Sequence, residues 1–447
     1  MTEPSNTSAF HLPKSFGVFD LVSIFVGIII GSAIYQTPST IAGILGSPSW
    51  ILLVWILGGL LSFLGALVYA ELASAYPREG GDYFFLHHAY GPWAGFLYAW
   101  GRLVVIHTGN IASMAYIAGN YGTQLVAFPH SQTVYALAAV VLLTAINCLG
   151  IRQGKWTQNL LTSTKVLGLV GVIAVALFVR AAPVEAAEPA AVTGGITFGG
   201  LFMALIFVQF TFGGWSDCAF VAAEVKNPER NILRSLLLGM ALVTAIYLLV
   251  NVALILALGV PGMAASKSVM ADVLNLGFGR TGAGLLSALV VISALGSVNG
   301  MVLTGARIFH AFGRDHTLFR FMGHWDREKG APLVAFLVQG AISALLVLLG
   351  TFESLIIYTT AAHWIFLSGV GASLFVFRRR EPGVPRPYRV HLYPFIPLIY
   401  IASCLMLVYS SLTYANSVAP YGAGIGFLLV LSGLPFYWLS NLWRRAA

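Results

Sequence analysis

Two short stretches of this chain place glycine and polar residues inside long apolar runs. The first is Gly27–Ile34, which carries a Gly-Ser-Ala break, and no charged residue occurs from Leu21 to Ala70. The second is Phe207–Asp217, where a Gly-Gly pair stands beside an ionisable carboxyl group. Because hydrocarbon offers no water to pair with backbone groups, a helix broken there is stable when the loosened backbone lines a cavity and binds something. Close helix–helix packing is the competing interpretation of each stretch taken alone.

The ends of the broken helices define the chemistry that these stretches offer. A half-helix that begins after Gly31 presents free N–H groups and the positive end of its dipole, which suit a carboxylate. Half-helices that end near Ile29 and over 210–213 present unpaired carbonyls, which suit an ammonium group. A zwitterion satisfies both, so an α-amino acid is the simplest ligand, with the Ser32 hydroxyl as a further donor. Three aromatic residues are expected to wall the side-chain pocket or to gate it: Phe210, Phe212 and Trp215.

The composition is that of a polytopic membrane protein. Apolar residues make up 58% of the 447 residues, charged residues only 9%, and the mean hydropathy is +0.84. A soluble domain carries about 25% charged residues. Membrane topology explains the net charge of +8 better than nucleic-acid binding does. The three cysteines lie in or beside apolar runs and form no disulfide or metal-binding pattern.

Apolar runs of about 20 residues, the length needed to cross a bilayer, predict twelve transmembrane helices. Their expected ranges are 16–44, 50–76, 91–122, 131–150, 157–180, 197–224, 234–259, 282–311, 332–350, 354–377, 393–413 and 421–442. The first range is long for one straight span, which fits two half-helices joined by a non-helical segment. Pro38 is expected to begin or bend the second half.

Lysine and arginine residues are distributed unevenly between alternate loops. With the N-terminus inside, the inside segments hold 18 of them, the outside segments hold three, and three lie within spans. This asymmetry predicts that both termini are cytoplasmic and that the number of spans in the cytoplasmic membrane is even. The polar start from Met1 to Lys14 is expected to be a cytoplasmic tail and not a signal peptide.

The two interrupted spans are the first and the sixth of the twelve. Interrupted helices at corresponding places in two five-span halves indicate an inverted-repeat transporter with its site near the middle of the membrane. The matching positions make ligand binding a better interpretation than close packing. The predicted organisation is all-α, with a tail over 1–15, a first repeat over 16–180, a second repeat over 197–377, two further helices over 393–442 and a tail over 443–447.

Five stretches of the chain carry motifs that are specific in combination. They are Gly31–Ile34 with Pro38, Tyr69–Leu72 with Gly80–Tyr83, Phe212–Trp215, Glu224–Ile232, and Gly296–Gly300 with Ala306 and Arg307. Together they resemble the amino acid–polyamine–organocation (APC) superfamily, and within it the L-type amino acid exchangers and their bacterial relatives. The resemblance covers most of the chain through residue 350.

This resemblance implies a LeuT-like fold of five plus five inverted helices with two additional helices at the C-terminus. It also implies a site in which the backbone of Ser32 and Ala33 holds a substrate carboxylate. The carbonyls of Ile29, Phe210 and Gly213 would hold the amine. The expected substrate-binding residues are Ile29, Ile30, Gly31, Ser32, Ala33, Phe210, Thr211, Phe212, Gly213 and Gly214, with Phe210 and Trp215 as gates.

Two features depart from the family pattern. Ala33 stands where the family usually has glycine, and alanine does not adopt a positive φ angle cheaply. The backbone is therefore expected to be helix-like at Ala33, or else the pocket is altered. No cysteine occurs over 122–132, where heavy-chain-linked animal relatives carry one. We expect a monomer without a disulfide-linked heavy chain, whose partners are its amino acid substrate and the lipid bilayer.

Two ionisable residues within predicted spans are candidates for coupling or conformational change, because such groups are costly in a membrane. Lys165 lies one to two turns into the fifth span. In the resembling family a lysine here reaches toward the first and eighth spans and stands where Na⁺ sits in sodium-coupled relatives; snorkelling to the cytoplasmic face is the alternative. For Asp217 three roles stay open: a proton carrier, a contact for a cationic substrate, or the partner of a buried base such as Arg102 or His107.

Other polar groups in the spans have structural interpretations. Ion pairing near the cytoplasmic ends is expected for Glu71, Glu224 and Arg307. Three single histidines lack the spacing of metal ligands and are interpreted as core residues: His107, His310 and His363.

The predicted function is secondary active, sodium-independent exchange of L-amino acids by alternating access, with no cofactor, no metal, no nucleic acid and no enzymatic activity. A proton-coupled symporter of amino acids, polyamines or amines is the alternative within the same class. A membrane-embedded enzyme or sensor would be of another class, but no cluster of histidine and carboxylate residues at one interface and no soluble domain accompanies the spans. The side-chain preference stays open, with Ser297 and Asn299 favouring small polar substrates.

Overall fold

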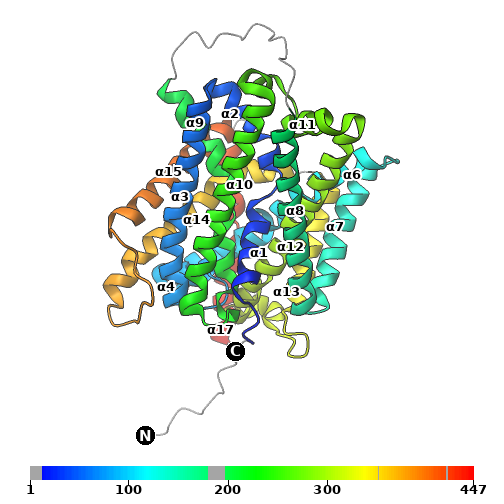
Figure 1. Cartoon of the computed structure of the whole chain (residues 1–447). Coiled ribbons are helices and arrows are strands. Elements are labelled where there is room, and N and C mark those ends of the chain that lie inside the picture. Colours follow the sequence, from blue (N-terminus) through cyan, green and yellow to red (C-terminus); the bar gives the residue numbers. More distant parts are fainter. Residues whose placement is uncertain (1–12, 180–196, 351, 419–420, 447) are drawn as a thin grey trace.

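The structure is a computed structural model of the chain that describes residues 13–179, 197–350, 352–418 and 421–446. Most of the predicted tail 1–15, and Arg180, lie outside these ranges. Within them the regular elements are helices, accompanied by two isolated β-bridges. Most of the helices run side by side through one bundle (Figure 1). The prediction of an all-α chain is therefore confirmed for the described residues.

The helices have the following bounds: α1 Val18–Ile29, α2 Thr37–Leu45, α3 Pro48–Ala75, α4 Asp82–Tyr90, α5 Pro92–Gly101, α6 His107–Leu125, α7 Ser131–Cys148, α8 Ile151–Phe178, α9 Phe198–Thr211, α10 Pro228–Ala265, α11 Val269–Phe278, α12 Gly282–Asp315, α13 Leu333–Leu349, α14 Phe352–Arg380, α15 Phe395–Val418, α16 Gly422–Leu431 and α17 Gly433–Ala446. Four 3₁₀-helical segments lie between them, η1 Ala33–Tyr35, η3 Trp215–Glu224, η4 Gly279–Thr281 and η5 Thr317–Gly323, and one π-helical segment, η2 Arg102–Ile106.

Proline and glycine set many of these bounds. Pro48, Pro92 and Pro228 occupy the first positions of α3, α5 and α10, where the missing N–H costs nothing and the fixed φ angle favours a helix. Gly46 and Gly350 end α2 and α13 in the left-handed conformation, with φ angles of 60° and 64°, as glycine after a helix commonly does.

Nine helical segments among the described residues are long and apolar enough to cross a membrane. They correspond to nine of the twelve predicted spans. The other three are interrupted or short: 16–44 is broken, 91–122 consists of α5, the π-helical segment and α6, and 332–350 contains the 17-residue helix α13. Helices α4 and α11 were not predicted. Both fall in stretches that the sequence assigned to loops.

Both predicted breaks are present. After α1 ends at Ile29, Ile30 has φ −73° and ψ 74°, outside the helical range, and the chain resumes as a 3₁₀ turn before α2. After α9 ends at Thr211, Gly214 has a φ angle of 101°. The continuation over Trp215–Glu224 is 3₁₀-helical, with a narrower and more extended backbone than an α-helix.

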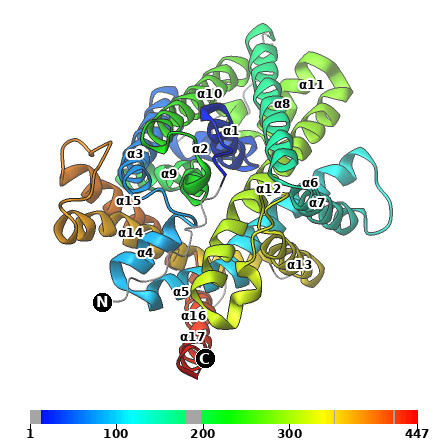
Figure 2. The ribbon, with the colours of Figure 1, turned by 90° about the horizontal axis from the view of Figure 1, so that it is seen from below.

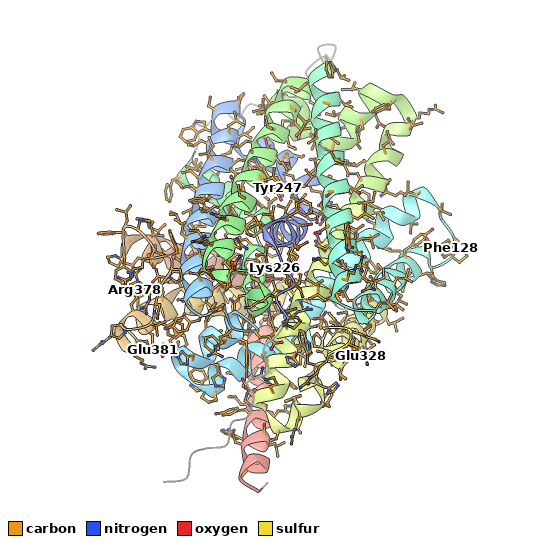
Figure 3. The ribbon with its side chains drawn as sticks, turned by 60° about the horizontal axis from the view of Figure 1, so that its bottom comes forward. Phe128, Lys226, Tyr247, Glu328, Arg378 and Glu381 are labelled. Atoms are coloured by element: carbon orange, nitrogen blue, oxygen red, sulfur yellow. The ribbon has the colours of Figure 1, made fainter. Side chains whose placement is uncertain are left out.

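Helix α1 lies near the middle of the bundle, with α3, α8, α10 and α12 around it (Figure 2). It packs directly on α8, α10 and α12, while α14 and α15 pack on each other at the periphery. The start of α1 and the end of α17 lie at the same end of the bundle, the lower end in Figure 1. Figure 3 turns this end forward and labels Lys226 and Glu328, in segments that join helices, and Arg378, in the last turn of α14.

Candidate functional site

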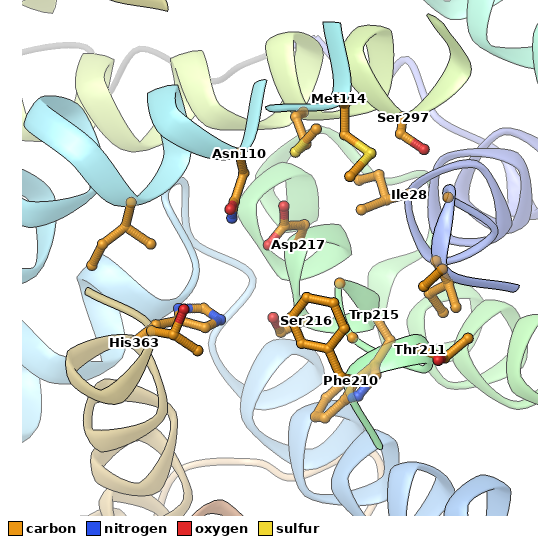
Figure 4. A pocket seen from close by; sticks show the side chains of 18 of the residues that line it. Ile28, Asn110, Met114, Phe210, Thr211, Trp215, Ser216, Asp217, Ser297 and His363 are labelled. Atoms are coloured by element: carbon orange, nitrogen blue, oxygen red, sulfur yellow. The ribbon is translucent and has the colours of Figure 1, made fainter. Parts of the chain in front are cut away.

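A cavity of about 190 Å³ lies between the two broken helices. An apolar cavity of about 150 Å³ admits benzene, so this one has room for a small amino acid. Of the predicted residues, Ile29, Gly31, Ser32, Ala33, Phe210, Thr211, Gly213, Gly214, Trp215 and Asp217 line it. Ile30, Phe212 and Lys165 do not line it. The remaining lining residues are Ile28, Arg102, Ile106, Asn110, Met114, Ser216, Ser297, Met301, Thr360, His363, Trp364 and Leu367 (Figure 4).

The break after α1 presents unpaired donors to the cavity. Among the described residues, none accepts a hydrogen bond from the backbone N–H of Ser32 or Ala33. Ser32 has φ −77° and ψ −22°, so both residues stand at the start of a helical turn with their N–H groups unpaired. Donors at a helix start, with the dipole behind them, are suited to a carboxylate. The geometry agrees with the chemistry expected from the sequence.

Ala33 is accommodated without strain at this position. It begins the 3₁₀ turn Ala33–Tyr35 and is not among the residues with a positive φ angle, which are His130, Asn227, Leu392 and Tyr421 apart from glycines. Of the two outcomes expected for Ala33, the helix-like backbone is the one present. The side chain lines the cavity and narrows it by one methyl group relative to glycine.

The carbonyls predicted to meet an ammonium group differ in how free they are. The Ile29 carbonyl accepts hydrogen bonds from the Gly31 N–H at 2.7 Å and from the Tyr247 hydroxyl at 3.1 Å. The Tyr247 hydroxyl has a single proton, which it shares between Ile29 and the Thr211 carbonyl at 3.3 Å. The Ile29 carbonyl is therefore partly engaged and less available than the sequence suggested. The Phe210 carbonyl accepts a bond from the Gly213 N–H at 3.1 Å and is also approached by the Phe212 N–H. No described residue donates to the Gly213 carbonyl.

Lys165 holds the first break from behind. Its side chain is fully buried on α8, and Nζ donates to the carbonyls of Gly27 at 2.8 Å, Ile30 at 2.9 Å and Ser293 at 2.7 Å. These acceptors lie on α1, in the break after it, and on α12. Three donors therefore meet three carbonyls, which is the full capacity of an ammonium group. The snorkelling alternative for Lys165 does not occur in the structure.

Two serines of α12 complete the support of this break. Ser293 Oγ donates to the Ile30 carbonyl at 2.9 Å, and Ser297 Oγ donates to the Gly27 carbonyl at 3.0 Å. Asn299, considered with Ser297 for the pocket, bonds instead to Asn147 and Gln158 outside the cavity. Ile30 is therefore a supporting residue, because lysine and serine side chains occupy its carbonyl behind the cavity.

Asp217 forms an ion pair with Arg102. The Arg102 Nη2 atom donates to Asp217 Oδ1 at 3.0 Å, and the two side chains are 2% and 7% exposed. Both residues line the cavity. Of the three roles left open for Asp217, pairing with a buried base is present, and the base is Arg102. His107 is not the partner, since its Nε2 atom lies 2.9 Å from the Met301 carbonyl oxygen.

The three predicted aromatic residues divide into different environments. Phe210 is 59% exposed at the margin of the cavity, whereas Trp215 is 6% exposed and packs edge-on against Tyr69 with ring centroids 4.9 Å apart. Phe212 is fully buried away from the cavity, against Trp55 and Tyr247. Phe210 is therefore the candidate for a gate at the cavity, and Phe212 belongs to the core.

The three charged residues for which ion pairing was predicted, Glu71, Glu224 and Arg307, are paired in the structure. Arg307 Nε donates to Glu224 Oε1 at 2.8 Å with both side chains buried, and Arg378 Nη2 donates to Glu71 Oε2 at 2.6 Å. His310 pairs with Glu79 at 2.6 Å. His363 is the exception among the histidines interpreted as core residues: it is on the cavity wall, and its Nδ1 atom has no described hydrogen-bond partner.

Most of the cavity residues that the sequence did not reveal come from α6, α14 and the π-helical segment. Arg102 and Ile106 delimit this segment, and Asn110 follows it on α6. A π-helical turn shifts the face of the residues after it and is often found at functional sites. Arginine within a predicted span was the one available signal, because an ionisable group there is functional by default.

Comparison with known proteins places this site in a family. Residues 16–437 match the family described as Amino acid permease. The human large neutral amino acids transporter small subunit 2 is 31% identical over 448 residues, which cover 97% of this chain and 82% of the relative. The human Asc-type amino acid transporter 1 is 29% identical over 458 residues, covering 99% and 85%. The serine/threonine exchanger SteT of Bacillus subtilis (strain 168) is 27% identical over 431 residues, covering 96% and 97%.

These relatives are all named as transporters or exchangers, and the match includes both broken helices. The resemblance to the APC superfamily is confirmed. Because it extends over nearly the whole chain, this multi-pass membrane protein belongs to the amino acid permease family.

Proposed function

We propose that the protein exchanges L-amino acids across the cytoplasmic membrane by alternating access, without sodium. One observation carries this proposal: two broken helices present unpaired backbone N–H and C=O groups to one cavity of about 190 Å³. A free amino acid is the small molecule that carries both a carboxylate and an ammonium group in one compact unit. The names of the relatives, which include a serine/threonine exchanger, support the same substrate class.

In the proposed complex, the substrate carboxylate binds the N–H groups of Ser32 and Ala33. The ammonium group binds the Gly213 carbonyl, which no described residue engages, with the Phe210 carbonyl as a second acceptor. Because the backbone groups that bind the two charged ends are already fixed, little conformational entropy of the protein is lost on binding. The Phe210 ring, half-exposed at the cavity margin, serves as the gate that covers the bound substrate.

Sodium independence rests on Lys165. A fixed ammonium group already supplies three donors to the carbonyls of Gly27, Ile30 and Ser293. A sodium ion would need oxygen ligands of the same kind, and the lysine occupies them. Proton-coupled symport is the alternative that an uptake experiment separates from exchange.

The proposed architecture is twelve transmembrane helices in two inverted five-helix repeats, with both termini cytoplasmic and no disulfide-linked partner. Contacts at the end where α1 begins support a conformation closed on the cytoplasmic side. The N–H groups of Ser15 and Phe16 donate to the Glu224 carbonyl at 2.8 and 3.1 Å, and the Lys226 N–H donates to the Phe16 carbonyl at 3.0 Å. Rocking of the helices around the cavity would have to separate these pairs before the substrate is released inward.

Uptake by purified protein in liposomes tests this function. We expect saturable uptake of labelled amino acids that is stimulated several-fold by unlabelled amino acid inside the liposomes and is unchanged when choline replaces sodium outside. Stimulation by an inward proton gradient, with no effect of internal amino acid, would indicate the symport alternative. Protein-free liposomes are the control. No saturable uptake of any amino acid by folded protein would overturn the proposed function.

A further inference from the structure

One end of the cavity carries a buried ion pair that the binding of a substrate backbone does not use. Three ionisable side chains are found among the described residues that line the cavity: the guanidinium of Arg102, the carboxylate of Asp217 and the imidazole of His363. In Figure 4, Asn110 and His363 lie on the side of the cavity opposite Ile28, the second-last residue of α1, and Asp217 and Ser216 lie between them. A polar end with two opposite charges therefore faces the backbone-binding end.

The pair is fixed by its surroundings. Arg102 belongs to the π-helical segment and Asp217 to the 3₁₀ continuation of the second broken helix. The guanidinium carbon lies 5.0 Å from the centroid of the Phe220 ring and 5.5 Å from that of Tyr98, distances at which a cation is attracted to a ring face. The Arg102 Nε atom is buried and has no hydrogen-bond partner among the described residues, so the ion pair does not use this donor.

The second carboxylate near Arg102 is that of Asp82, on the short helix α4. It does not line the cavity and accepts a hydrogen bond from the Tyr98 hydroxyl at 3.0 Å. Burial raises the pKa of Asp82 to about 7. A test at about pH 6 therefore leaves this carboxyl largely protonated, and the charges of Arg102 and Asp217 then balance each other at the cavity wall.

We infer that the Arg102–Asp217 pair is a charge filter that restricts the cavity to amino acids with uncharged side chains. The inference rests on the proposed function, since it assumes that the backbone of the substrate lies at the two breaks and its side chain points toward the pair. An acidic or basic side chain would enter a site whose charges are already matched, and would lose its hydration without gaining an unpaired counter-charge. A neutral side chain meets no such penalty, and a hydroxyl or carboxamide can donate to Asp217 Oδ2, to which no described residue donates.

Each half of the pair predicts a different change of selectivity. Asp217→Asn keeps the shape of the side chain but leaves Arg102 as an unmatched cation, which an acidic substrate side chain can neutralise. Arg102→Gln leaves Asp217 as an unmatched anion, which a basic side chain can neutralise. The double variant removes both charges and returns the site to balance. This reciprocal pattern would not follow from a pair that only stabilises the fold.

The experiment measures uptake of labelled serine, glutamate and lysine into liposomes at about pH 6 by wild type, both single variants and the double variant. We expect wild type to take up serine and neither charged amino acid. We expect the glutamate-to-serine ratio to rise about tenfold or more in Asp217→Asn, and the lysine-to-serine ratio to rise similarly in Arg102→Gln. The double variant is expected to prefer serine again.

Glu224→Gln is the matched control, because Glu224 pairs with Arg307 in an equally buried ion pair that does not line the cavity. It can change the rate of transport but is expected to keep the wild-type preference for neutral amino acids. Where a single variant is too unstable for transport, the shift of its melting temperature by serine, glutamate or lysine in detergent supplies the same ratios. Arg102→Met serves as the second variant at that position.

The outcomes separate the two claims. Wild-type protein that transports no amino acid overturns the proposed function. Wild-type protein that transports lysine or glutamate as well as serine overturns the charge filter and leaves the proposed function standing. Single variants that bind or transport serine with an unchanged charge preference also overturn the filter, since the pair would then lie outside the side-chain subsite.

Discussion

Replacing Lys165 with alanine is expected to lower amino acid uptake by about 100-fold, equivalent to about 2.7 kcal/mol of lost transition-state or binding free energy. The substitution removes three hydrogen bonds, to the carbonyls of Gly27, Ile30 and Ser293. A hydrogen bond from a charged donor contributes about 1.5–3 kcal/mol, and among the described residues only the serine hydroxyls of α12 would remain as donors to the Ile30 and Gly27 carbonyls. The backbone of the break after α1 would then shift so that these carbonyls find other donors. As a result, the free N–H groups of Ser32 and Ala33 would no longer be oriented toward the cavity.

Two further variants make the Lys165 result interpretable. Lys165→Met keeps the length and apolar volume of the side chain, so an equal loss of uptake assigns the effect to the ammonium group. Lys155→Met on the same helix removes a partly exposed lysine that pairs with Asp20 at 3.2 Å, and such pairs contribute about 0–1 kcal/mol; it is expected to keep uptake within about threefold of wild type. Uptake by Lys165→Met at the wild-type rate would refute the role of this lysine.

Gly214→Ala is expected to lower uptake by about 30-fold or more, the second largest effect. Gly214 has a φ angle of 101°, in a region that costs an L-residue about 1–2 kcal/mol. The added methyl carbon would also lie 2.7 Å from Ile28 Cγ2, and Ile28 precedes the other break. The substitution therefore pushes the two broken helices apart at the cavity, which weakens both halves of the site together.

Two other glycines calibrate this prediction. A methyl group on Gly43, on α2, meets no atom within 4 Å, so Gly43→Ala is expected to transport like wild type. A methyl group on Gly213 lies 3.1 Å from the Phe210 carbonyl oxygen, and its backbone is not in the left-handed region. Gly213→Ala should therefore lose less uptake than Gly214→Ala. Equal uptake by Gly214→Ala and Gly43→Ala would show that the second break tolerates a side chain and is not under conformational constraint.

Sequence alone predicted the breaks because their signal is local. Glycine, serine and proline within a charge-free apolar run are incompatible with an ordinary membrane helix, so both interruptions could be found without knowing what packs beside them. For Lys165 and Asp217 the sequence predicted only alternative roles and did not identify the groups that each side chain contacts. The choice between them depends on which helices meet, as with Arg102 and Asp217, which are 115 residues apart in the chain.

The parts of the site that escaped prediction depend on tertiary packing. Asn110, Met114, Thr360 and His363 lie on apolar helices whose cavity-facing side has no distinct pattern, because a helix that is buried on several sides shows little amphipathic periodicity. The π-helical segment adds a register shift that residue spacing does not reveal. The engagement of the Ile29 carbonyl by Tyr247 likewise needed the position of α10, which no local motif specifies.

The most direct test of the proposed function is whether the cavity binds both charged ends of a free amino acid. The measurement is competition against uptake of a labelled substrate by the unlabelled amino acid, by its methyl ester and by its N-acetyl derivative, in liposomes with purified protein. The ester lacks the carboxylate that Ser32 and Ala33 are proposed to bind, and the N-acetyl compound lacks the ammonium group assigned to the Phe210 and Gly213 carbonyls. We predict that each derivative needs a concentration about 100-fold higher than the parent for half-inhibition; equal inhibition by parent and derivatives would contradict backbone capture of the zwitterion.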